Sequence, residues 1–415
     1  MADGIRVEEL FPAESLAALD ASGPVEVLIG IPALNDARSV AQVVATAATG
    51  LTKHFPGREG IVLVLDAGSQ DGTLEAVRTW RETAPPIPVV QGIRLAGSPH
   101  RGRALLAILA AARRLRVQGC ALVDADLIGI APEWVDRLLQ PVLRNEADYV
   151  SPAYTRAVSE GTLTTNLLAP MIQALYGKRL QQPLGGCAGL SGEMLGRFLQ
   201  ADSLVSGMSA HEVDLWLTIE ALASGAKVVE THLGRKLVDP ALAQPDLATI
   251  VAQVVGVLFR LMEVYHAVWN EIRGSVRLPQ VGDQAAAPAE AGETNVERMV
   301  RAFRLGLKDL LPVWEQVMPE ETLARLYPLG LLAADEFQFP TPIWARVVSG
   351  FALAYHERRL PRDHLLRALT PLYLGRVAAF LREAQESPPS RLPDILEAIG
   401  RAFEAEKEFL RARWR

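Results

Sequence analysis

The chain has 415 residues, of which 49% are hydrophobic and 22% charged, and its formal net charge is −6 at pH 7. At roughly 150 residues per domain, this length predicts two to three domains, or one large domain with an appendage, and the composition excludes a wholly disordered chain. The acidic balance argues against a general nucleic-acid binder or a protein that binds anionic membranes.

The first 130 residues alternate between strand-like apolar runs and helix-like segments. The expected strands are residues 25–31, 61–65, 89–93 and 121–123, and the expected helices are residues 37–49, 74–83 and 103–116. Alternation at this spacing predicts an α/β fold, a mostly parallel sheet with helices on both faces. Ligands bind at the carboxyl ends of the strands in such sheets, and the polar turns of this segment fall there.

The pattern changes twice after residue 130. Residues 134–222 are less regular, with turn-rich islands at 161–165 and 182–186, and a last strand is expected at 228–233 before a loop at 234–239. From residue 246 onward the apolar periodicity predicts long amphipathic helices. The polar low-complexity stretch 274–294 between them is typical of a flexible loop or linker. We therefore expect a catalytic α/β domain over residues 1–240 and a C-terminal α-helical region over residues 241–415.

Three features bear on the cellular compartment. The acidic N-terminus lacks the apolar core of a signal peptide. The apolar run at 104–112 is shorter than the roughly 20 residues of a membrane span, and the run at 250–262 is interrupted by Gln253 and Arg260. The two cysteines, Cys120 and Cys187, lie in unrelated contexts, which fits a reducing compartment and excludes a zinc cluster. We expect a soluble cytoplasmic protein without a membrane span.

Two carboxylates follow the fourth expected strand. Asp124 and Asp126 flank Ala125, and alternate residues of extended backbone point to the same side. Like charges this close need a divalent cation or a basic side chain to neutralise them. A metal ion held by such carboxylates fills its other positions with water and phosphate oxygens, which suits a diphosphate leaving group. An isolated D-x-D more often starts a helix, but its place at a strand end favours a metal site.

Two earlier turns carry polar residues at strand ends. PALND (residues 32–36) follows the first strand, and VLDAGSQDGT (residues 64–73) contains the end of the second. We interpret Asp66 as a ligand for a uracil N–H or a ribose hydroxyl. Gly68 and Gly72 are better explained by the conformational needs of a turn.

The order PALND, VLDAGSQDGT, VDADL and, about 60 residues later, QPLGG resembles that of GT-A nucleotide-sugar glycosyltransferases. More narrowly, it is similar to the retaining synthases that make glucosylglycerate, mannosylglycerate or glucosyl-3-phosphoglycerate. The similarity covers roughly residues 25–260. It implies the GT-A fold, a Rossmann-like and mostly parallel sheet, and its element order agrees with the periodicity.

The resemblance also implies roles for individual residues. It makes Asp124 and Asp126 the ligands of Mg²⁺ or Mn²⁺, and it makes Arg101 and Asp214 catalytic, with Asp214 beside the sugar and the acceptor hydroxyl. The implied donor-binding residues are Pro32, Ala33, Leu34, Asp66, Ser69, Arg101, Ala125, Leu184, Gly185 and Gly186. The implied acceptor-binding residues are Arg156, Thr164 and Thr165.

Three positions depart from the family pattern. His100-Arg101-Gly102 stands where the family has Gly-Lys-Gly, which keeps the charge but changes its reach. Cys187 replaces an acidic residue after the glycine pair. Val238 stands where the family has a metal-binding histidine, so Asp239 or His232 would have to serve as the third ligand.

The D-x-D predicts a metal-dependent enzyme, and the family resemblance implies that it is a retaining hexosyltransferase. It would move glucose or mannose from a nucleotide-diphospho-sugar such as UDP-glucose to a small anionic hydroxy acid, glycerate or 3-phosphoglycerate. The three departures leave open a non-catalytic relative that binds a nucleotide-sugar or a protein partner. A sugar-phosphate nucleotidyltransferase ranks last, because PALND offers no glycine-rich basic phosphate loop. A homodimer through the aromatic helical region also stays open.

Overall fold

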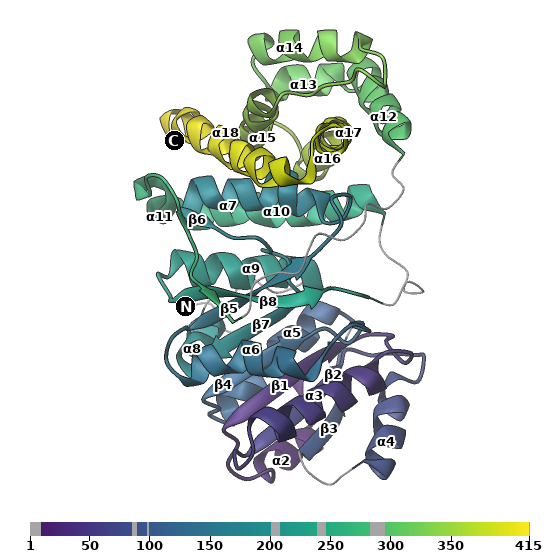
Figure 1. The fold of residues 1–415 in the computed structure, drawn as a ribbon, viewed down its shortest axis with the longest axis vertical. Coiled ribbons are helices and arrows are strands. Elements are labelled where there is room, and N and C mark those ends of the chain that lie inside the picture. Colours follow the sequence, from purple (N-terminus) through teal and green to yellow (C-terminus); the bar gives the residue numbers. More distant parts are fainter. Residues whose placement is uncertain are drawn as a thin grey trace. The chain divides into compact units, whose positions relative to one another are not determined.

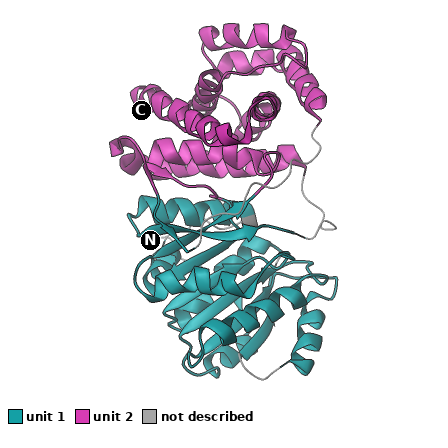
Figure 2. Ribbon diagram, viewed as in Figure 1, with its two compact units in different colours: residues 1–155, 184–243, 278–286 teal, residues 156–183, 244–277, 287–415 magenta. Residues whose placement is uncertain are grey.

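A computed structural model describes residues 10–84, 89–97, 99–200, 208–238, 246–282 and 295–414. The chain forms two compact units, each made of discontinuous segments (Figure 2). Unit 1 comprises Met1–Thr155, Leu184–Ala243 and Leu278–Ala286, and unit 2 comprises Arg156–Pro183, Gln244–Arg277 and Ala287–Arg415.

Unit 1 is built on an eight-stranded, mostly parallel sheet (Figure 1). In sheet order its strands are β10 (Gln280–Val281), β8 (Val228–Arg235), β5 (Tyr149–Thr155), β7 (Cys187–Ser191), β4 (Gly119–Val123), β1 (Val27–Ala33), β2 (Gly60–Asp66) and β3 (Val89–Arg94). Only β7 runs antiparallel to its neighbours, β4 and β5. The predicted α/β fold with a parallel sheet is thus confirmed.

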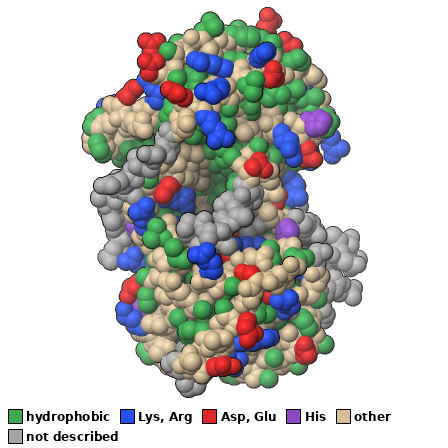
Figure 3. All heavy atoms as spheres, turned by 90° about the vertical axis from the view of Figure 1, so that its right-hand side faces the viewer, with side chains coloured by type: hydrophobic (Ala, Val, Ile, Leu, Met, Phe, Trp, Pro, Cys, Tyr) green, Lys and Arg blue, Asp and Glu red, His purple; other side chains and the backbone are tan. Residues whose placement is uncertain are grey.

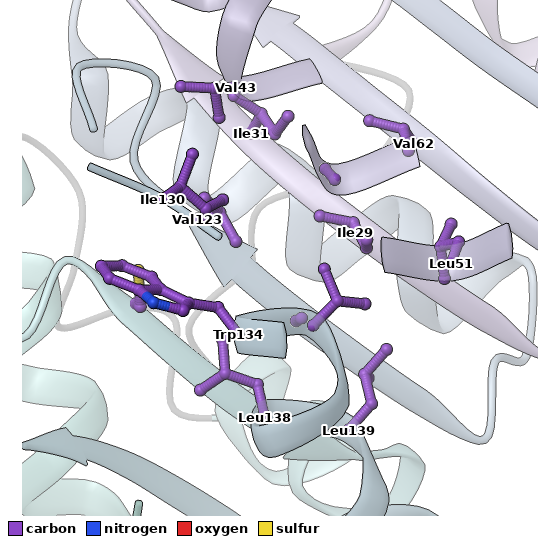
Figure 4. Packing of buried hydrophobic residues seen from close by; sticks show 14 of the residues in the cluster. Ile29, Ile31, Val43, Leu51, Val62, Val123, Ile130, Trp134, Leu138 and Leu139 are labelled. Carbon is purple, nitrogen blue, oxygen red and sulfur yellow. The ribbon is translucent and has the colours of Figure 1, made fainter. Parts of the chain in front are cut away.

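Helices cover both faces of this sheet. One face carries α3 (Val40–His54), α4 (Thr73–Thr83) and α6 (Pro132–Leu143), and the other carries α5 (Arg101–Arg114), α8 (Gly192–Gln200) and α9 (Ala210–Ala223); α2 (Ala13–Asp20) precedes β1. Alternate residues of β1 and β4 pack against α3 and α6, where Ile29, Val43, Val123 and Leu138 lie together in the core (Figure 4). This burial on both faces explains the continuous apolar runs of the central strands.

Strand β1 continues two residues beyond the predicted end at Ile31. Its pairing with β4 ends at Gly30, whereas its pairing with β2 continues to Ala33. Pro32 therefore lies beside one neighbouring strand only, where the missing N–H of proline does not interrupt a ladder on both sides. The proline was expected to end the strand, and the one-sided pairing explains why it does not.

Unit 2 is almost entirely helical. Its elements are the π-helix η1 (Thr164–Leu168), α7 (Ala169–Tyr176), α10 (Leu247–Val264), α11 (His266–Glu271), α12 (Val296–Asp309), α13 (Leu311–Val317), α14 (Glu320–Leu331), α15 (Thr341–His356), α16 (Arg362–Ala368), α17 (Thr370–Glu386), the 3₁₀ helix η3 (Pro389–Arg391) and α18 (Leu392–Arg413), with the short strand pair β6 (Lys178–Arg179) and β9 (Val276–Arg277). The predicted C-terminal helical region is confirmed.

The distribution of segments between the units differs from a single boundary at residue 240. Residues 156–183 were expected in the first domain and belong to unit 2. The expected linker at 274–294 begins with two short strands, β9 in unit 2 and β10 in unit 1, which pair with β6 and β8. Residues 283–294 of that linker lie outside the described residues.

Helix α10 is long and apolar enough to cross a membrane by those two measures alone, with a mean hydropathy of 1.8 over 18 residues. Half of it is buried in the fold, where it packs on α15 and α16, and core helices of globular proteins meet the same criteria. No other helix within the described ranges does so.

On the face drawn in Figure 3, acidic and basic side chains are interspersed with neutral ones.

Candidate active site

The polar residues predicted in unit 1 gather at the carboxyl ends of β1, β2 and β4. Ala33 and Asp66 are paired in register as the last residues of β1 and β2, and Asp124 follows the last residue of β4. A parallel arrangement brings these ends to the same edge of the sheet. This edge is where the segments PALND, LDAGSQDGT and DAD meet.

Arg101 reaches this edge because it is the first residue of α5, two residues earlier than the predicted start of that helix. A side chain at the next position, Gly102, would place its Cβ 2.2 Å from the carbonyl oxygen of Met208. Glycine therefore allows the start of α5 to pack closely against the segment that precedes α9. This close packing fixes the position of Arg101.

The guanidinium of Arg101 lies among three carboxylates. Its Nη2 is 3.6 Å from Asp124 Oδ1 and 3.7 Å from Asp126 Oδ1, and its Nη1 is 3.8 Å from Asp36 Oδ1. The D-x-D carboxylates thus share a basic neighbour, which is one of the two kinds of neutralising group expected from the sequence. Burial alone would lower the pKa of Arg101, but the nearby carboxylates of Asp124, Asp36 and Asp126 raise it above its ordinary value, so it remains a cation.

The glycine pair of QPLGG is held against the D-x-D by backbone hydrogen bonds. The N–H of Asp124 donates to the Gly186 carbonyl (3.1 Å), and the N–H of Gly186 donates to Asp214 Oδ2 (3.1 Å). Gly186 has φ +67°, and a Cβ there would lie 1.9 Å from Asp124 Oδ2. Only glycine satisfies both the left-handed backbone and the contact with the carboxylate.

Two further side chains meet at the carbonyl of Gly185. Lys236 Nζ and the Tyr154 hydroxyl each donate a hydrogen bond of 2.9 Å to this oxygen. Lys236 Nζ also lies 3.7 Å from Asp124 Oδ2 and 5.6 Å from the centre of the Tyr154 ring. Lys236 is therefore a second cation beside the D-x-D.

The site holds more carboxylates than cations. Four carboxylates, Asp36, Asp124, Asp126 and Asp214, accompany the two basic groups of Arg101 and Lys236, an excess of two. Burial raises the pKa of Asp36 to about 6 and that of Asp214 to about 7, and burial together with the charge of Asp124 raises the pKa of Asp126.

Two buried carboxylate oxygens of this group accept no hydrogen bond from the part of the chain that the structure describes. Asp36 Oδ1 and Asp126 Oδ1 are buried and have no hydrogen-bond donor among the described residues. Mg²⁺ and Mn²⁺ prefer such oxygens and keep water or phosphate in their remaining positions. The residues present therefore fit a divalent cation held by Asp124 and Asp126.

The expected third metal ligand is not found in the described part of the chain. Val238 pairs with Leu127 in an isolated antiparallel bridge, which brings position 238 directly beside the D-x-D without a ligating side-chain atom. Both ring nitrogens of His232 have other partners, the Thr155 hydroxyl (3.2 Å) and the N–H of Gly234 (3.2 Å). Asp239, the other substitute that the sequence suggested, lies outside the described residues, and no group of three metal-binding side chains occurs within them.

The predicted nucleotide wall is a hydrogen-bonded turn around the buried Asp66. Its Oδ1 accepts from the N–H groups of Gly68 (3.0 Å) and Ser69 (2.7 Å), and its Oδ2 lies 3.2 Å from Arg94. The Ser69 hydroxyl accepts from the N–H of Asn35 (2.8 Å), which ties this turn to PALND. Asp66 Oδ2 is buried and accepts no hydrogen bond from any described residue, so it can accept one from a ligand.

The predicted acceptor residues lie in unit 2. Thr164 and Thr165 are the first residues of the π-helix η1, where Thr164 is buried and Thr165 partly exposed, and Arg156 precedes them. A Cβ added to Gly161 would lie 2.5 Å from a guanidinium nitrogen of Arg156, so Arg156 folds back over this turn. π-Helical turns occur frequently at functional sites.

Sequence reasoning missed three members of the unit 1 site. Asp36 was named only as part of the segment PALND, and Tyr154 and Lys236 were not singled out. Lys236 is one of six lysines in the chain and lies two residues before the position expected to hold the metal-binding histidine. A lysine so close to that position, in a chain whose basic residues are mostly arginine, was the available signal.

Comparison with known proteins agrees with this geometry. Residues 28–195, which contain β1, β2, the D-x-D and the glycine pair, match the family described as Glycosyl transferase family 2. The matched segment is therefore similar to the domain of that family. With its mostly parallel sheet covered by helices on both faces, the domain has the GT-A fold that the sequence resemblance implied. No curated protein matches the chain.

Several solved structures resemble this chain in part. Glucosyl-3-phosphoglycerate synthase from Mycobacterium tuberculosis, in complex with Mn²⁺, UDP-glucose and phosphoglyceric acid, is 21% identical, with 61% of this chain and 85% of that chain covered and a TM-score of 0.44. The same enzyme with Mg²⁺ and UDP is 21% identical over 61% and 84%, with a TM-score of 0.43. A mycobacterial protein is 22% identical over 61% and 79%, with a TM-score of 0.44.

Proposed function

We propose that this protein is a metal-dependent hexosyltransferase. It moves glucose or mannose from a nucleotide-diphospho-sugar to a small anionic hydroxy acid such as glycerate or 3-phosphoglycerate, with retention at the sugar carbon. The observation that carries the proposal is the excess of two carboxylates around the D-x-D at the carboxyl edge of a family 2 sheet. The choice of sugar, acceptor and stereochemistry comes from the sequence resemblance.

The donor's diphosphate is the group that this site has to bind and release. A divalent cation held by Asp124 and Asp126 would supply two positive charges beside the diphosphate as the bond to the sugar breaks. Arg101 brings a fixed cation whose Nε and Nη2 are buried and make no hydrogen bond with the described residues. These N–H groups are available for phosphate oxygens, and guanidinium binds phosphate well.

The remaining residues orient the donor and the acceptor hydroxyl. Asp66 accepts a hydrogen bond from the base or the ribose, and the Gly185–Gly186 backbone lies beneath the sugar. Asp214, fixed by the N–H of Gly186, orients the acceptor hydroxyl and stabilises the positive charge that develops on the sugar ring. No serine or cysteine nucleophile is needed, and burial raises the pKa of the Cys187 thiol to about 12, which keeps it protonated.

The acceptor would be recognised by its negative charge. Arg156 supplies a cation, and the hydroxyls of Thr164 and Thr165 supply hydrogen-bond donors to a carboxylate. This assignment rests on the resemblance alone, and the three residues share one turn of unit 2.

The direct test is donor binding and sugar transfer. Purified protein is titrated with UDP-glucose and GDP-mannose, with Mg²⁺, with Mn²⁺ and with EDTA, and then incubated with glycerate or 3-phosphoglycerate. We expect metal-dependent binding of one donor and transfer of its sugar with the anomeric configuration kept. Absence of both binding and transfer would overturn the proposal.

A second candidate is a non-catalytic relative that binds a nucleotide-sugar. It is favoured by two observations: Arg101 and Lys236 already lie beside Asp124, and Val238 offers no third metal ligand. Nucleotide binding that is unaffected by Asp126→Ala, together with no turnover in the unchanged protein, would select this candidate. Loss of turnover in Asp126→Ala from an active parent would exclude it.

A further inference from the structure

Lys236 lies beside two parts of the proposed donor site in unit 1, the Gly185–Gly186 pair and the D-x-D. Its Nζ donates to the carbonyl of Gly185 (2.9 Å) and lies 3.7 Å from Asp124 Oδ2. A Cβ placed on Gly186 would lie 2.6 Å from the same Nζ, so the ammonium group fills the space between the glycine pair and the D-x-D. Its side chain is 17% exposed, which places the charge in a weakly solvated position.

A fixed positive charge at this point has two opposite electrostatic consequences. It repels a divalent cation that approaches Asp124, because like charges at short range in a poorly solvated site interact strongly. It attracts a diphosphate, whose charge is negative. Arg101 lies 3.6 Å from the other oxygen of Asp124, so this carboxylate has a basic group on both of its oxygens.

We propose that Lys236 is a built-in competitor of the metal ion: its ammonium group weakens divalent-cation binding at Asp124 and strengthens binding of the diphosphate. The proposal rests on the function proposed above and adds a positioning residue to the same site. Lys236 makes the metal and the nucleotide bind together, because the negative diphosphate offsets the repulsion that the metal meets alone. The empty protein therefore binds metal poorly, and the nucleotide brings it in.

The test compares three variants by binding. Lys236→Met removes the charge and keeps a side chain of similar length, and Lys236→Arg keeps the charge. Tyr154→Phe is the matched control, because it removes the other hydrogen bond to Gly185 without a change in charge. Mn²⁺ alone is titrated into nucleotide-free protein and followed by the electron paramagnetic resonance signal of free Mn²⁺. UDP is titrated in EDTA by calorimetry, and uridine, which carries no phosphate, serves as its control.

We expect Lys236→Met to bind Mn²⁺ about tenfold more tightly and metal-free UDP about tenfold more weakly, with uridine affinity unchanged. Lys236→Arg should resemble the unchanged protein, and Tyr154→Phe should not tighten Mn²⁺ binding. The inference is overturned if Lys236→Met leaves Mn²⁺ affinity equal or weaker, or if Tyr154→Phe tightens it as much.

The two proposals fail in different ways. If the unchanged protein binds neither Mn²⁺ nor UDP, the proposed transferase function fails. If it binds both and transfers sugar while Lys236→Met binds Mn²⁺ and UDP as the unchanged protein does, only the role of Lys236 fails.

Discussion

At the scale of single residues, Asp36 and Asp214 show what it costs to bury more carboxyl groups than basic groups in one site. Burial is the main cause that raises their pKa values, to about 6 and about 7, and the neighbouring carboxylates add to it. Each group is therefore harder to ionise in the folded chain than in the unfolded chain, where an aspartate has a pKa near 3.9. While no cation is bound, ionisation of these two carboxyl groups therefore lowers the stability of the folded protein.

This difference predicts a pH dependence of stability in EDTA. Between about pH 4 and pH 7 the unfolded chain has released these protons and the folded chain still holds them, so the free energy of unfolding falls as pH rises. Asp214→Asn removes one such group. The decrease in the free energy of unfolding between pH 4 and pH 7 should therefore be smaller by about 2 kcal/mol in this variant, while its stability near pH 4 changes little. Urea unfolding of both proteins at pH 4, 5.5 and 7 measures this difference in the free energy of unfolding. A slope equal to that of the unchanged protein would contradict the assigned environment of Asp214.

At the scale of elements, the loop between Leu184 and β7 depends on a glycine. Gly186→Ala would combine a left-handed backbone with a Cβ 1.9 Å from Asp124 Oδ2, so we expect a loss of sugar transfer of about 100-fold or more. Gly234→Ala is the matched control: its φ is +84°, but nothing lies within 4 Å of the added Cβ. It shares the backbone strain, about 1 kcal/mol, without the contact.

Activity assays and thermal unfolding of both variants separate the two effects. Both should lose a similar small amount of stability through backbone strain, and only Gly186→Ala should lose transfer. Equal activity losses would show that strain alone, and not the contact with the D-x-D, explains the glycine.

In unit 2, the π-helix η1 is fixed by buried polar groups of α15 and α17. Arg376 Nε donates to Asn166 Oδ1 (3.1 Å) and its Nη1 donates to the Phe339 carbonyl (2.8 Å), while Trp344 Nε1 donates to the Asn166 carbonyl (2.6 Å). The Thr162 hydroxyl, one turn earlier, bonds the hydroxyl of Tyr373 (2.7 Å). The irregular helix is thus held by side chains more than 170 residues away in sequence.

Arg376→Met should therefore destabilise unit 2 by about 2–4 kcal/mol, because it leaves two buried acceptors without this donor. Arg382→Met is the control on the same helix: Arg382 also donates to a carbonyl, that of Phe337 (3.2 Å), and its hydrogen bonds within the described residues do not involve η1. It should cost about 1 kcal/mol or less. Chemical denaturation followed by tryptophan fluorescence measures both, and equal losses would mean that η1 does not depend on Arg376.

The sequence predicted these elements unequally. Apolar runs ending in polar turns identified β1, β2 and β4 and their common edge, and short-range motifs identified Asp66, the D-x-D and the glycine pair. Lys236 was missed because its role arises from the packing of β8 beside β5, which places residues 236 and 185 together across 51 positions. Local spacing contains no information about such a contact.

The domain division was the least predictable property of the whole molecule. The islands at 161–165 and 182–186 were read as irregular parts of the first domain, yet they bracket a segment that folds with the C-terminal helices. The apolar residues of that segment, including Met171 and Leu175 of α7, are buried. Their periodicity shows that they are buried but does not identify the element against which they pack.

This interleaving predicts that the chain cannot be shortened at the boundary that its sequence suggests. A chain ending at residue 243 would lack α18, against which α7 packs, and would lack β10, the edge strand beside β8. We expect it to aggregate or to unfold at least about 10 °C below the full chain, because apolar surface of α7 is left in water. Thermal unfolding monitored by circular dichroism tests this expectation. A cooperative transition at the temperature of the full chain would show that unit 1 folds without its later segments.

The same topology determines the order in which the nascent protein can mature. Gln173 of α7 bonds Glu404 of α18, 231 positions later, and Lys407 of α18 donates to the Leu175 carbonyl, 232 positions earlier. At roughly 10 residues per second, the ribosome needs about 20 seconds to deliver α18 after α7 has been made. During that interval α7 lacks α18, the helix with which it has its most extensive packing, so chaperone binding during translation would protect this face of α7.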